Sequence, residues 1–375
     1  MNLPDRFAGC LLGGAVGDAL GAPIEFMSRT EILQRFGPGG LTDHAPAYGG
    51  IGRITDDTQM MLFTADGLIR AEVRGAHRGI THPVSVTAHA YLRWLQTQGE
   101  QPQNASVFGV DEPGWLFQIQ ALHACRAPGF TCLSALKQMP NLGAAAENDS
   151  KGCGGIMRMA PVGLWMLGLN TPSADADCFR LACKLAGLTH GHPTGQLPAG
   201  VLAVLIRLLA QGQKLADALI IASAALAEQA TLSDAQETQA AIQRAIALAK
   251  TAKQNRCTDA EHADHIAQLG EAWVAEEALA ISLYCAWVAR DFEHGIRLSI
   301  NHSGDSDSTG SITGNLLGCC LGIDAIPKRW LQPLELRSEI ESMAKDLCHY
   351  GSADWHDPTR PAIESPETWQ RYPGY

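Results

Sequence analysis

The chain has 375 residues, a length that buries a large hydrophobic core without disulfide or metal cross-links. Hydrophobic residues make up 46% and charged residues 18%, which excludes an intrinsically disordered chain and a charge-rich coiled coil. The net charge of -11 argues against non-specific binding to nucleic acid or to an anionic membrane surface, so we expect neither partner.

The cysteines and the N-terminal region indicate a protein of the cytoplasm. The 11 cysteines form no C-x-x-C pair, and Cys319 and Cys320 are adjacent, so neither a disulfide framework nor a zinc spacing is present. We therefore expect reduced thiols in a reducing compartment. The apolar run 7–17 lacks a positively charged flank and is expected to be a buried helix rather than a signal peptide. No uninterrupted apolar stretch reaches the ~18 residues of a membrane span.

Apolar residues at helical spacing predict an all-α fold, with one compact multi-helix domain over residues 1–375. Met61, Ala65 and Leu68 recur at helical positions, and Ser233 with Gln236 matches a capping box whose N-cap is Ser233. Strand patterns are scarce, and a monomer is the simplest expectation. Further helices are expected at 201–209, 215–227, 273–290, 292–300 and 311–321, and irregular segments at 37–53, 98–114 and in a tail from about residue 348.

The first candidate site is a pair of acidic residues between threonines, in the segment Thr55-Asp56-Asp57-Thr58. An apolar helical pattern follows at once, so N-capping and the helix dipole explain one carboxylate. The second carboxylate is surplus to that role, and adjacent carboxylates repel each other unless a cation lies between them. Capping and cation binding therefore both remain open for this segment taken alone.

The second candidate site has Asp305 and Asp307 two positions apart, with Ser308 beside them and a helical pattern behind. Carboxylate and hydroxyl oxygens are the ligands of hard divalent cations. An EF-hand is excluded because Leu316 stands where that motif needs an acidic residue. If the two helix starts converge, four aspartates and the neighbouring hydroxyls could bind two metal ions.

Three further segments allow more than one interpretation. The glycine-rich segment 151–158 lacks the G-K-[ST] of a P-loop, but its backbone N–H groups could bind phosphate or simply form a packing turn. His190 and His192 lie in one short turn, where they could be metal ligands, ligand contacts or surface residues. Glu25 follows Pro23 at the start of a loop, and by itself it is expected at the surface.

Taken together and in this order, the segments resemble the ADP-ribosylglycohydrolase family. The family motifs are G-D-A-L-G, present at 17–21, T-D-D-T-x-M, present at 55–60, and G-D-x-D-[ST]-x-G, present at 304–310. The glycine-rich segment and the turn at Thr189-His190 fit between them. The resemblance spans about residues 11 to 322, which is most of the chain.

The resemblance implies an all-α fold around a centre of two divalent cations, Mg²⁺ or Mn²⁺. Glu25, Asp57 and Asp307 would be the catalytic residues, with Glu25 matched to a loop glutamate of the serine-specific relatives. The implied metal ligands are Thr55, Asp56, Asp57, Asp305, Asp307 and Ser308. Ser308 stands where the family often has a threonine, and Thr309 is a nearby alternative. The residues implied to bind the diphosphate and a distal part of ADP-ribose are Lys151, Gly152, Cys153, Gly154, Gly155, Ile156, Met157 and His190.

The implied reaction is metal-dependent hydrolysis of the N-glycosidic bond between ADP-ribose and an arginine side chain of a protein. The arginine specificity comes mainly from resemblance to the bacterial branch of the family, and the partners would be an ADP-ribosylated protein and ADP-ribose. Two alternatives remain open. One is hydrolysis of serine-linked or small-molecule ADP-ribose derivatives, and the other is a toxin-immunity protein that also binds and occludes its target.

Overall fold

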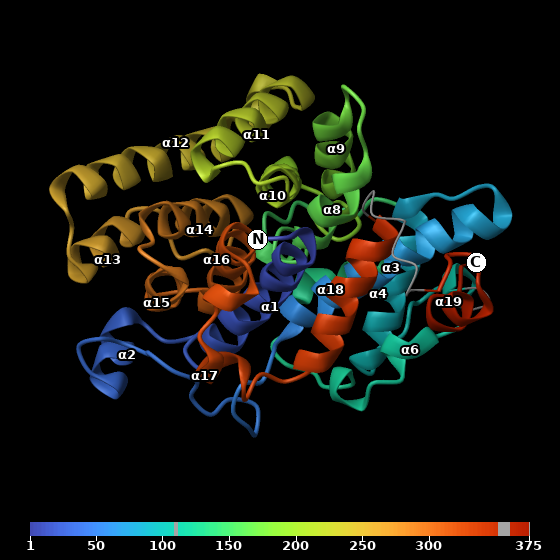
Figure 1. Ribbon diagram of the computed structural model, residues 1–375, viewed down its shortest axis with the longest axis horizontal. Helices are drawn as coiled ribbons and strands as arrows, with labels where there is room; N and C mark the ends of the chain where they lie inside the picture. Colours follow the sequence, from blue (N-terminus) through green and yellow to red (C-terminus); the bar gives the residue numbers. More distant parts are fainter. Residues whose placement is uncertain (109–111, 352–360, 375) are drawn as a thin grey trace.

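The computed structural model describes residues 1–108, 112–351 and 361–374, and these ranges are built from helices. Within them there is no β-strand, only the isolated bridges Ala47–Gly50 and Gly152–Val274. The helices surround a single pair of long central helices (Figure 1). The all-α prediction is therefore confirmed.

Helices α1 (Leu3–Gly21) and α16 (Ser306–Leu321) form this central pair and run antiparallel against each other. Glycines face glycines along the contact, and a Cβ atom added to Gly13 would lie 2.4 Å from the carbonyl oxygen of Gly314. The absence of side chains there lets the two backbones approach closely. The end of α1 consequently lies beside the start of α16, where a Cβ on Gly21 would meet Asp307 Cα at 2.4 Å.

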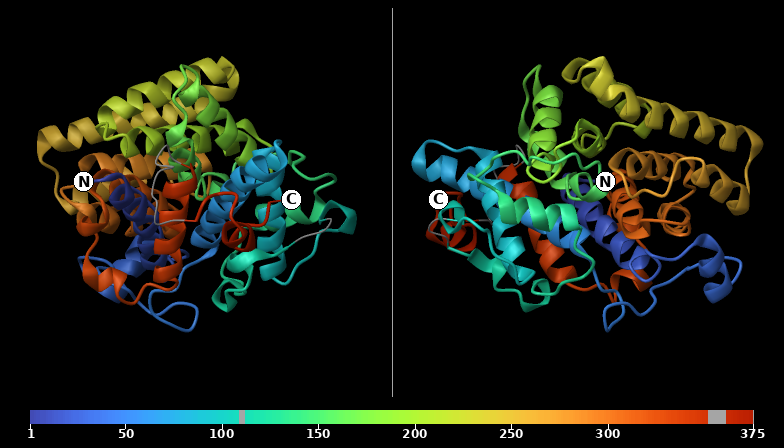
Figure 2. Two further views of the ribbon diagram at one scale, coloured as in Figure 1. Left: turned by 45° about the vertical axis from the view of Figure 1, so that its right-hand side comes forward. Right: turned by 180° about the vertical axis from the view of Figure 1, so that it is seen from behind.

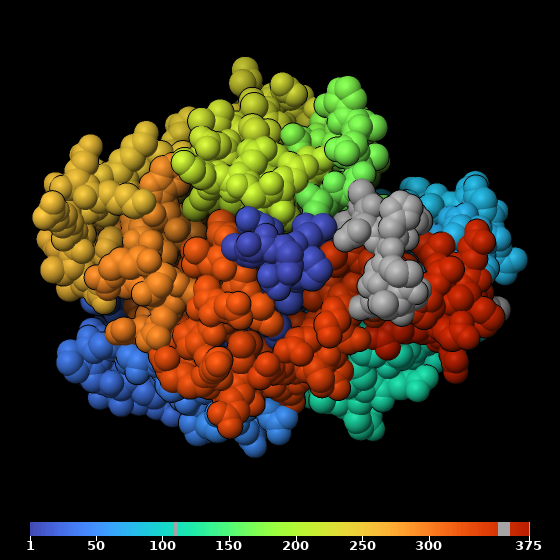
Figure 3. Space-filling view, viewed as in Figure 1, coloured from blue at the N-terminus to red at the C-terminus, as the bar shows by residue number. Residues whose placement is uncertain are grey.

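The other helices cover this pair. Helices α3 (Asp56–Arg78) and α4 (Pro83–Thr97) pack together on one side, and α14 (Ala275–Val288) and α15 (Phe292–Ile300) on another (Figures 1 and 2). Helix α12 (Leu232–Asn255) runs along the outside of α14. In the face shown in Figure 3, the N-terminal end of α1 reaches the surface between segments from the middle and the last third of the chain. The remaining α-helices are α2 (Arg29–Phe36), α5 (Ala105–Phe108), α6 (Gly114–Phe117), α7 (Phe130–Gln138), α8 (Ala160–Trp165), α9 (Ala174–Ala186), α10 (Pro193–Ala210), α11 (Leu215–Gln229), α13 (Asp259–Ala267), α17 (Lys328–Leu331), α18 (Arg337–Gly351) and α19 (Pro366–Arg371).

Among the described helices, α10 alone is long and apolar enough to cross a membrane by length and composition. It is 89% buried inside the protein, where α8, α9 and α11 pack against it. It also carries Arg207, whose guanidinium donates hydrogen bonds to the carbonyl oxygens of Met166 and Leu169. These features are those of a core helix, as the apolar run 201–209 predicts.

Several helix boundaries differ from the prediction. The N-cap of α12 is Thr231, whose hydroxyl accepts a hydrogen bond from the backbone N–H of Asp234, so the capping box proposed for Ser233 and Gln236 is wrong. Helix α14 begins two residues after Trp273, and α16 begins at Ser306 instead of residue 311. The range 292–300 matches α15.

The C-terminal tail is more ordered than predicted. Helix α18 continues to Gly351, and α19 follows, after which the buried Tyr372 donates a hydrogen bond to Asp346 at 2.6 Å. The burial of Tyr372 and its hydrogen bond thus hold the end of the chain against the rest of the protein, despite the prolines in this segment. Residues 352–360 of the expected tail lie outside the described residues, as do 109–111 of the segment 98–114, which contains the short helix α5. The segment 37–53 is a loop, as predicted.

Candidate active site

The two acidic loops meet because α3 and α16 begin side by side. Thr55 caps α3 by accepting a hydrogen bond from the N–H of Asp57 at 3.3 Å, and Asp305 caps α16 by accepting one from the N–H of Ser308 at 3.2 Å. Ser308 then donates its hydroxyl hydrogen to the carboxylate of Asp57. The expected convergence of the helix starts is present, with Asp56, Asp57 and Asp307 in the first turns.

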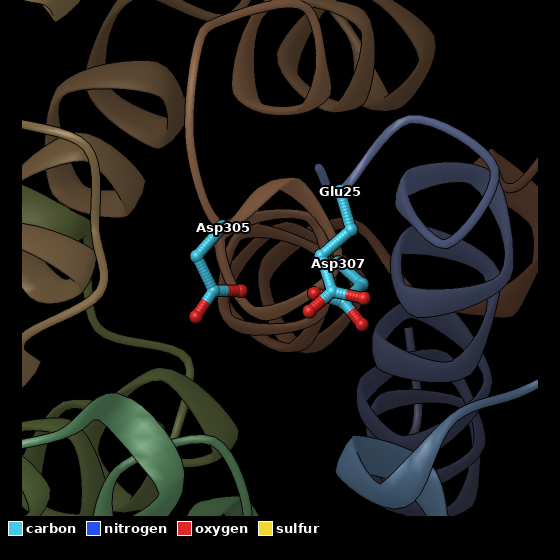
Figure 4. Close-up of side chains that lie close together, drawn as sticks. All are labelled: Glu25, Asp305 and Asp307. Carbon is cyan, nitrogen blue, oxygen red and sulfur yellow. The ribbon is translucent and has the colours of Figure 1, made fainter. Parts of the chain in front are cut away.

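Carboxylate oxygens of Glu25, Asp305 and Asp307 all lie within 4.8 Å of one another. In Figure 4, the carboxylate groups of Glu25 and Asp307 lie together, and the side chain of Asp305 lies to their left. Glu25 is only 7% exposed, so its expected place at the surface is wrong. The turn after α1, in which the N–H of Ile24 bonds to the carbonyl of Gly21, folds this residue over the start of α16.

The acidic side chains are buried without enough positive charge to balance them. Burial, followed by repulsion from Asp307 and Asp305, raises the pKa of Glu25 to about 11. Burial and then the charge of Asp307 raise the pKa of both Asp56 and Asp57 well above the usual range. Glu25 Oε2 also has no hydrogen-bond partner among the described residues. The site therefore offers hard oxygen donors, unbalanced negative charge and an unpartnered oxygen. These features suit the binding of divalent cations.

Asp18 supports this site from behind and is a residue whose role the sequence analysis missed. Its carboxylate accepts hydrogen bonds from the backbone N–H groups of Thr55, at 3.0 Å, and Thr58, at 3.1 Å. Both threonine hydroxyls also donate to it. Asp18 therefore fixes the backbone that presents Asp56 and Asp57. Its place in the G-D-A-L-G motif at 17–21 was the available signal.

A second support comes from the far end of the chain. The guanidinium of Arg126 donates a hydrogen bond to the carbonyl oxygen of Ile54 at 2.9 Å and forms an ion pair with Glu335. Glu335 also accepts a hydrogen bond from the N–H of Ile54 at 3.3 Å. These contacts hold the residue directly before Thr55. No local pattern connects residues 209 positions apart, so the sequence alone gave no signal for this pair.

A cavity of about 290 Å³ opens onto the acidic cluster. Acidic and hydroxyl residues line one end, and the glycine-rich segment and His190 also border it. The Cys153 thiol joins the two groups by donating to Asp305 Oδ2 at 2.7 Å. The lining residues are Glu25, Phe26, Asp56, Asp57, Ala127, Gly129, Phe130, Thr131, Cys132, Gly152, Cys153, Gly154, Met157, His190, Trp273, Asp305, Asp307 and Ser308.

Four of the residues expected at the site do not line this cavity. Lys151 is directed away and forms an ion pair with Glu237 at 2.7 Å. Gly155 and Ile156 are buried behind the lining. Thr55 is fully buried, and its hydroxyl donates to Asp18 at 2.9 Å.

The glycine-rich segment forms a 3₁₀ turn over Cys153–Gly155. The N–H of Cys153 donates to the carbonyl of Trp273 at 3.2 Å, which anchors the turn to the loop before α14. A Cβ atom on Gly154 would lie 2.9 Å from Cys132 Sγ and 3.2 Å from His190 Cε1. Only glycine therefore leaves the wall of the cavity open at this point.

The two histidines of the turn have different surroundings. Burial and the neighbouring charge of Arg158 lower the pKa of His190 to about 3, so its ring is neutral at pH 7. Its Nδ1 lies 2.8 Å from the hydroxyl of Thr189, which fixes the ring beside Gly154. His192 instead caps α10 by accepting a hydrogen bond from the N–H of Thr194. His190 is thus the one of the two that lines the cavity.

The all-α fold, the acidic cluster and the adjacent glycine-rich turn agree with the family that the sequence motifs indicate. The family model for ADP-ribosylglycohydrolase matches residues 1–356, and the chain belongs to this family. A solved structure described as an ADP-ribosylglycohydrolase-related protein complex superimposes with a TM-score of 0.63 at 26% identity, covering 93% of this chain and 99% of that chain.

Relatives with assigned names cover nearly the whole chain. The chain is similar to the ADP-ribosyl-[dinitrogen reductase] glycohydrolase of Rhodospirillum rubrum, with 27% identity over 91% of this chain and 94% of that protein. It is 24% identical to the ADP-ribosylarginine hydrolase Tri1 of Serratia proteamaculans, over 92% and 79% of the two chains. It is also 24% identical to the ADP-ribosylhydrolase ARH3 of Bos taurus, over 91% and 92%.

Proposed function

We propose that this protein hydrolyses the N-glycosidic bond between ADP-ribose and an arginine side chain, and so reverses mono-ADP-ribosylation of a protein. The observation that carries this proposal is the buried cluster of Glu25, Asp305 and Asp307 at one end of a cavity whose wall includes the glycine-rich turn. The cavity thus offers separate surroundings for a reacting sugar and for a diphosphate.

The acidic residues fit two divalent cations, for which we propose Mg²⁺ or Mn²⁺. Asp56, Asp57, Asp305 and Asp307 would hold them, with Glu25 and the hydroxyls of Thr55 and Ser308 as further oxygen donors. Such cations supply Lewis-acid chemistry that orients hydroxyl groups and lowers the pKa of a bound water. The carboxylates that they neutralise would otherwise repel one another in the protein interior.

The protein's own groups have distinct roles in this reaction. The turn at Gly152–Gly154 borders the region where a diphosphate needs donors, since the net charge of -11 does not attract phosphate. The N–H groups of Gly152 and Cys153 are bonded to Ser150 and Trp273, so the donor proposed for the diphosphate is the N–H of Gly154. The acidic end stabilises the oxocarbenium-like state through which a glycosidic bond breaks. Glu25 would orient the attacking water or accept its proton, which requires a distance of about 3 Å to that water.

Arginine as the acceptor has two supports. A relative that is similar over most of its length is named an ADP-ribosylarginine hydrolase, and a cationic guanidinium suits a cavity lined by five carboxylates. Serine-linked ADP-ribose is the competing substrate, because ADP-ribosylhydrolase ARH3 is similar to the same extent.

We further propose that the protein acts in the cytoplasm as a monomer. The ten cysteines other than Cys348 are free thiols, including Cys319 and Cys320, and this supports a reducing compartment.

The test of the proposed function is a comparison of two substrates with the purified protein and Mg²⁺. An ADP-ribosylarginine protein and an ADP-ribosylserine peptide are incubated separately, and the release of ADP-ribose is followed. A higher kcat/KM for the arginine linkage supports the proposal. A higher kcat/KM for the serine linkage overturns the arginine assignment.

A further inference from the structure

We propose that Phe26 and Trp273 form an aromatic platform that receives the guanidinium of the acceptor arginine and thereby selects the arginine linkage. This inference rests on the proposed function. The two rings are stacked, with centroids 5.8 Å apart and planes inclined by 18°. Both line the cavity, yet Phe26 is 71% and Trp273 41% exposed. Large aromatic side chains left exposed at a cavity commonly serve recognition.

The backbone of the Trp273 loop is held in place although the side chain is exposed. The carboxylate of Glu277 accepts hydrogen bonds from the N–H groups of Glu271, at 3.0 Å, and Ala272, at 3.1 Å. Ala272 adopts a φ of 66°, a left-handed conformation that is uncommon for alanine. The carbonyl of Trp273 then accepts from Cys153. The protein thus fixes a strained loop that presents this indole at the cavity.

The platform lies at the end of the cavity where the glycosidic bond breaks. Phe26 directly follows Glu25, whose carboxylate clusters with Asp305 and Asp307. The loop of Trp273 abuts the second acidic loop, since the carbonyl of Glu271 accepts a hydrogen bond from the N–H of Asp305 at 2.8 Å. Adenine is separated from the scissile bond by two riboses and a diphosphate, so the group nearest the platform is the leaving group.

An aromatic face suits a guanidinium leaving group at this place. The guanidinium is planar and cationic, and it stacks on aromatic rings through cation–π attraction. A further carboxylate could also attract it but would compete for the metal ions. A serine leaving group has neither charge nor a flat face. The platform therefore discriminates between the two linkages without taking part in the chemistry.

The test replaces the rings with leucine, which keeps apolar bulk but removes the π system. Phe26→Leu and Trp273→Leu are expected to lower kcat/KM for ADP-ribosylarginine by roughly 2- to 30-fold, the range of cation–π energies. They should leave kcat/KM for ADP-ribosylserine and the Kd of free ADP-ribose unchanged. Phe26→Tyr and Trp273→Phe should retain the wild-type preference. An unchanged melting temperature establishes that the leucine variants are folded.

Phe130→Leu is the matched control, because Phe130 is an exposed aromatic residue that lines the same cavity from α7. It should not change the ratio of kcat/KM for arginine to that for serine. If both leucine variants kept the wild-type ratio of kcat/KM for arginine to that for serine, this inference would be overturned and the proposed function would stand. Weaker binding of free ADP-ribose by the leucine variants would also overturn this inference, because the two rings would then contact the ADP-ribose that both substrates share. A wild-type protein inactive on ADP-ribosylarginine would overturn the proposed function itself.

Discussion

The hydroxyl of Ser308 donates a hydrogen bond to the carboxylate of Asp57, with Oγ 3.0 Å from Oδ1 and 3.1 Å from Oδ2, although the residues are 251 positions apart. This contact joins the first turn of α3 to the first turn of α16. The two acidic loops therefore form one site, and removing a carboxylate from either loop should affect ions bound by both.

Asp307→Ala should reduce hydrolysis by more than about 100-fold, because loss of even an outer-shell partner of a metal costs about 10- to 100-fold. It should also reduce the rise in melting temperature caused by Mg²⁺, since a bound ion stabilises the folded state. Thermal unfolding with and without Mg²⁺ measures the second effect. Asp324→Ala, at an exposed position, is the control. Normal binding of two ions by Asp307→Ala would contradict the site assignment.

Removal of divalent cations with EDTA should make stability fall as the pH rises. A carboxyl whose pKa is higher in the folded protein stabilises it below the unfolded pKa, and this contribution is lost as the pH rises through the folded pKa. Asp18, with a folded pKa of about 7, and Glu25, with one of about 11, start from unfolded values of about 4. The melting temperature in EDTA should therefore decrease from pH 4 to above pH 7.

Mg²⁺ should reverse this loss, because a bound cation favours the ionised carboxylates. Glu25→Gln has no titrating group at this position and should show a flatter pH profile in EDTA. A metal-free melting temperature that rises steadily between about pH 5 and pH 8 would contradict the assigned direction of these pKa shifts.

Gly154→Val should weaken the binding of ADP-ribose by roughly 10-fold or more, equivalent to about 1.4 kcal/mol. The new Cβ would meet Cys132 and His190 and narrow the cavity. Metal-dependent stabilisation should persist, since Gly154 lies outside the acidic cluster. Isothermal titration with ADP-ribose gives the Kd. The control is Gly39→Val, where an added Cβ has no neighbour nearer than 3.7 Å. An unchanged Kd for ADP-ribose would show that the turn serves only in packing and does not bind the diphosphate.

Asp18→Ala should destabilise the protein by at least about 3 kcal/mol, because it leaves buried donors unpaired at a cost of about 1–3 kcal/mol each. These donors are the N–H and hydroxyl groups of Thr55 and Thr58. Urea unfolding measures the loss. The affinity for Mg²⁺ should fall as well, since Thr55 leads directly into the acidic pair. A variant of wild-type stability would show that Asp18 is not the anchor of this loop.

Periodicity and motif order were enough to predict the helical fold and the acidic loops. Apolar spacing located α15, and the segment 55–58 was correctly predicted to lead into a helix, which is α3. The start of α16 was predicted five residues too late. Local patterns were less reliable at helix ends. Both Thr231 and Ser233 are competent N-caps, and only the backbone geometry decides that Thr231 is used.

Long-range contacts explain the remaining differences. The burial of Glu25 depends on a turn that packs against α16, whose first residue, Ser306, is 281 positions away (306 − 25). The orientation of Lys151 depends on Glu237. The support of Ile54 by Arg126 and Glu335 likewise joins three distant segments. A single sequence contains the residues of such contacts but not their pairing.

The most direct test of the account follows both products from an ADP-ribosylarginine protein incubated with the purified enzyme and Mg²⁺. The predicted result is stoichiometric release of ADP-ribose with recovery of unmodified arginine, abolished by EDTA and by Asp307→Ala. Intact ADP-ribosylarginine after incubation with the metal-loaded wild-type protein would contradict it.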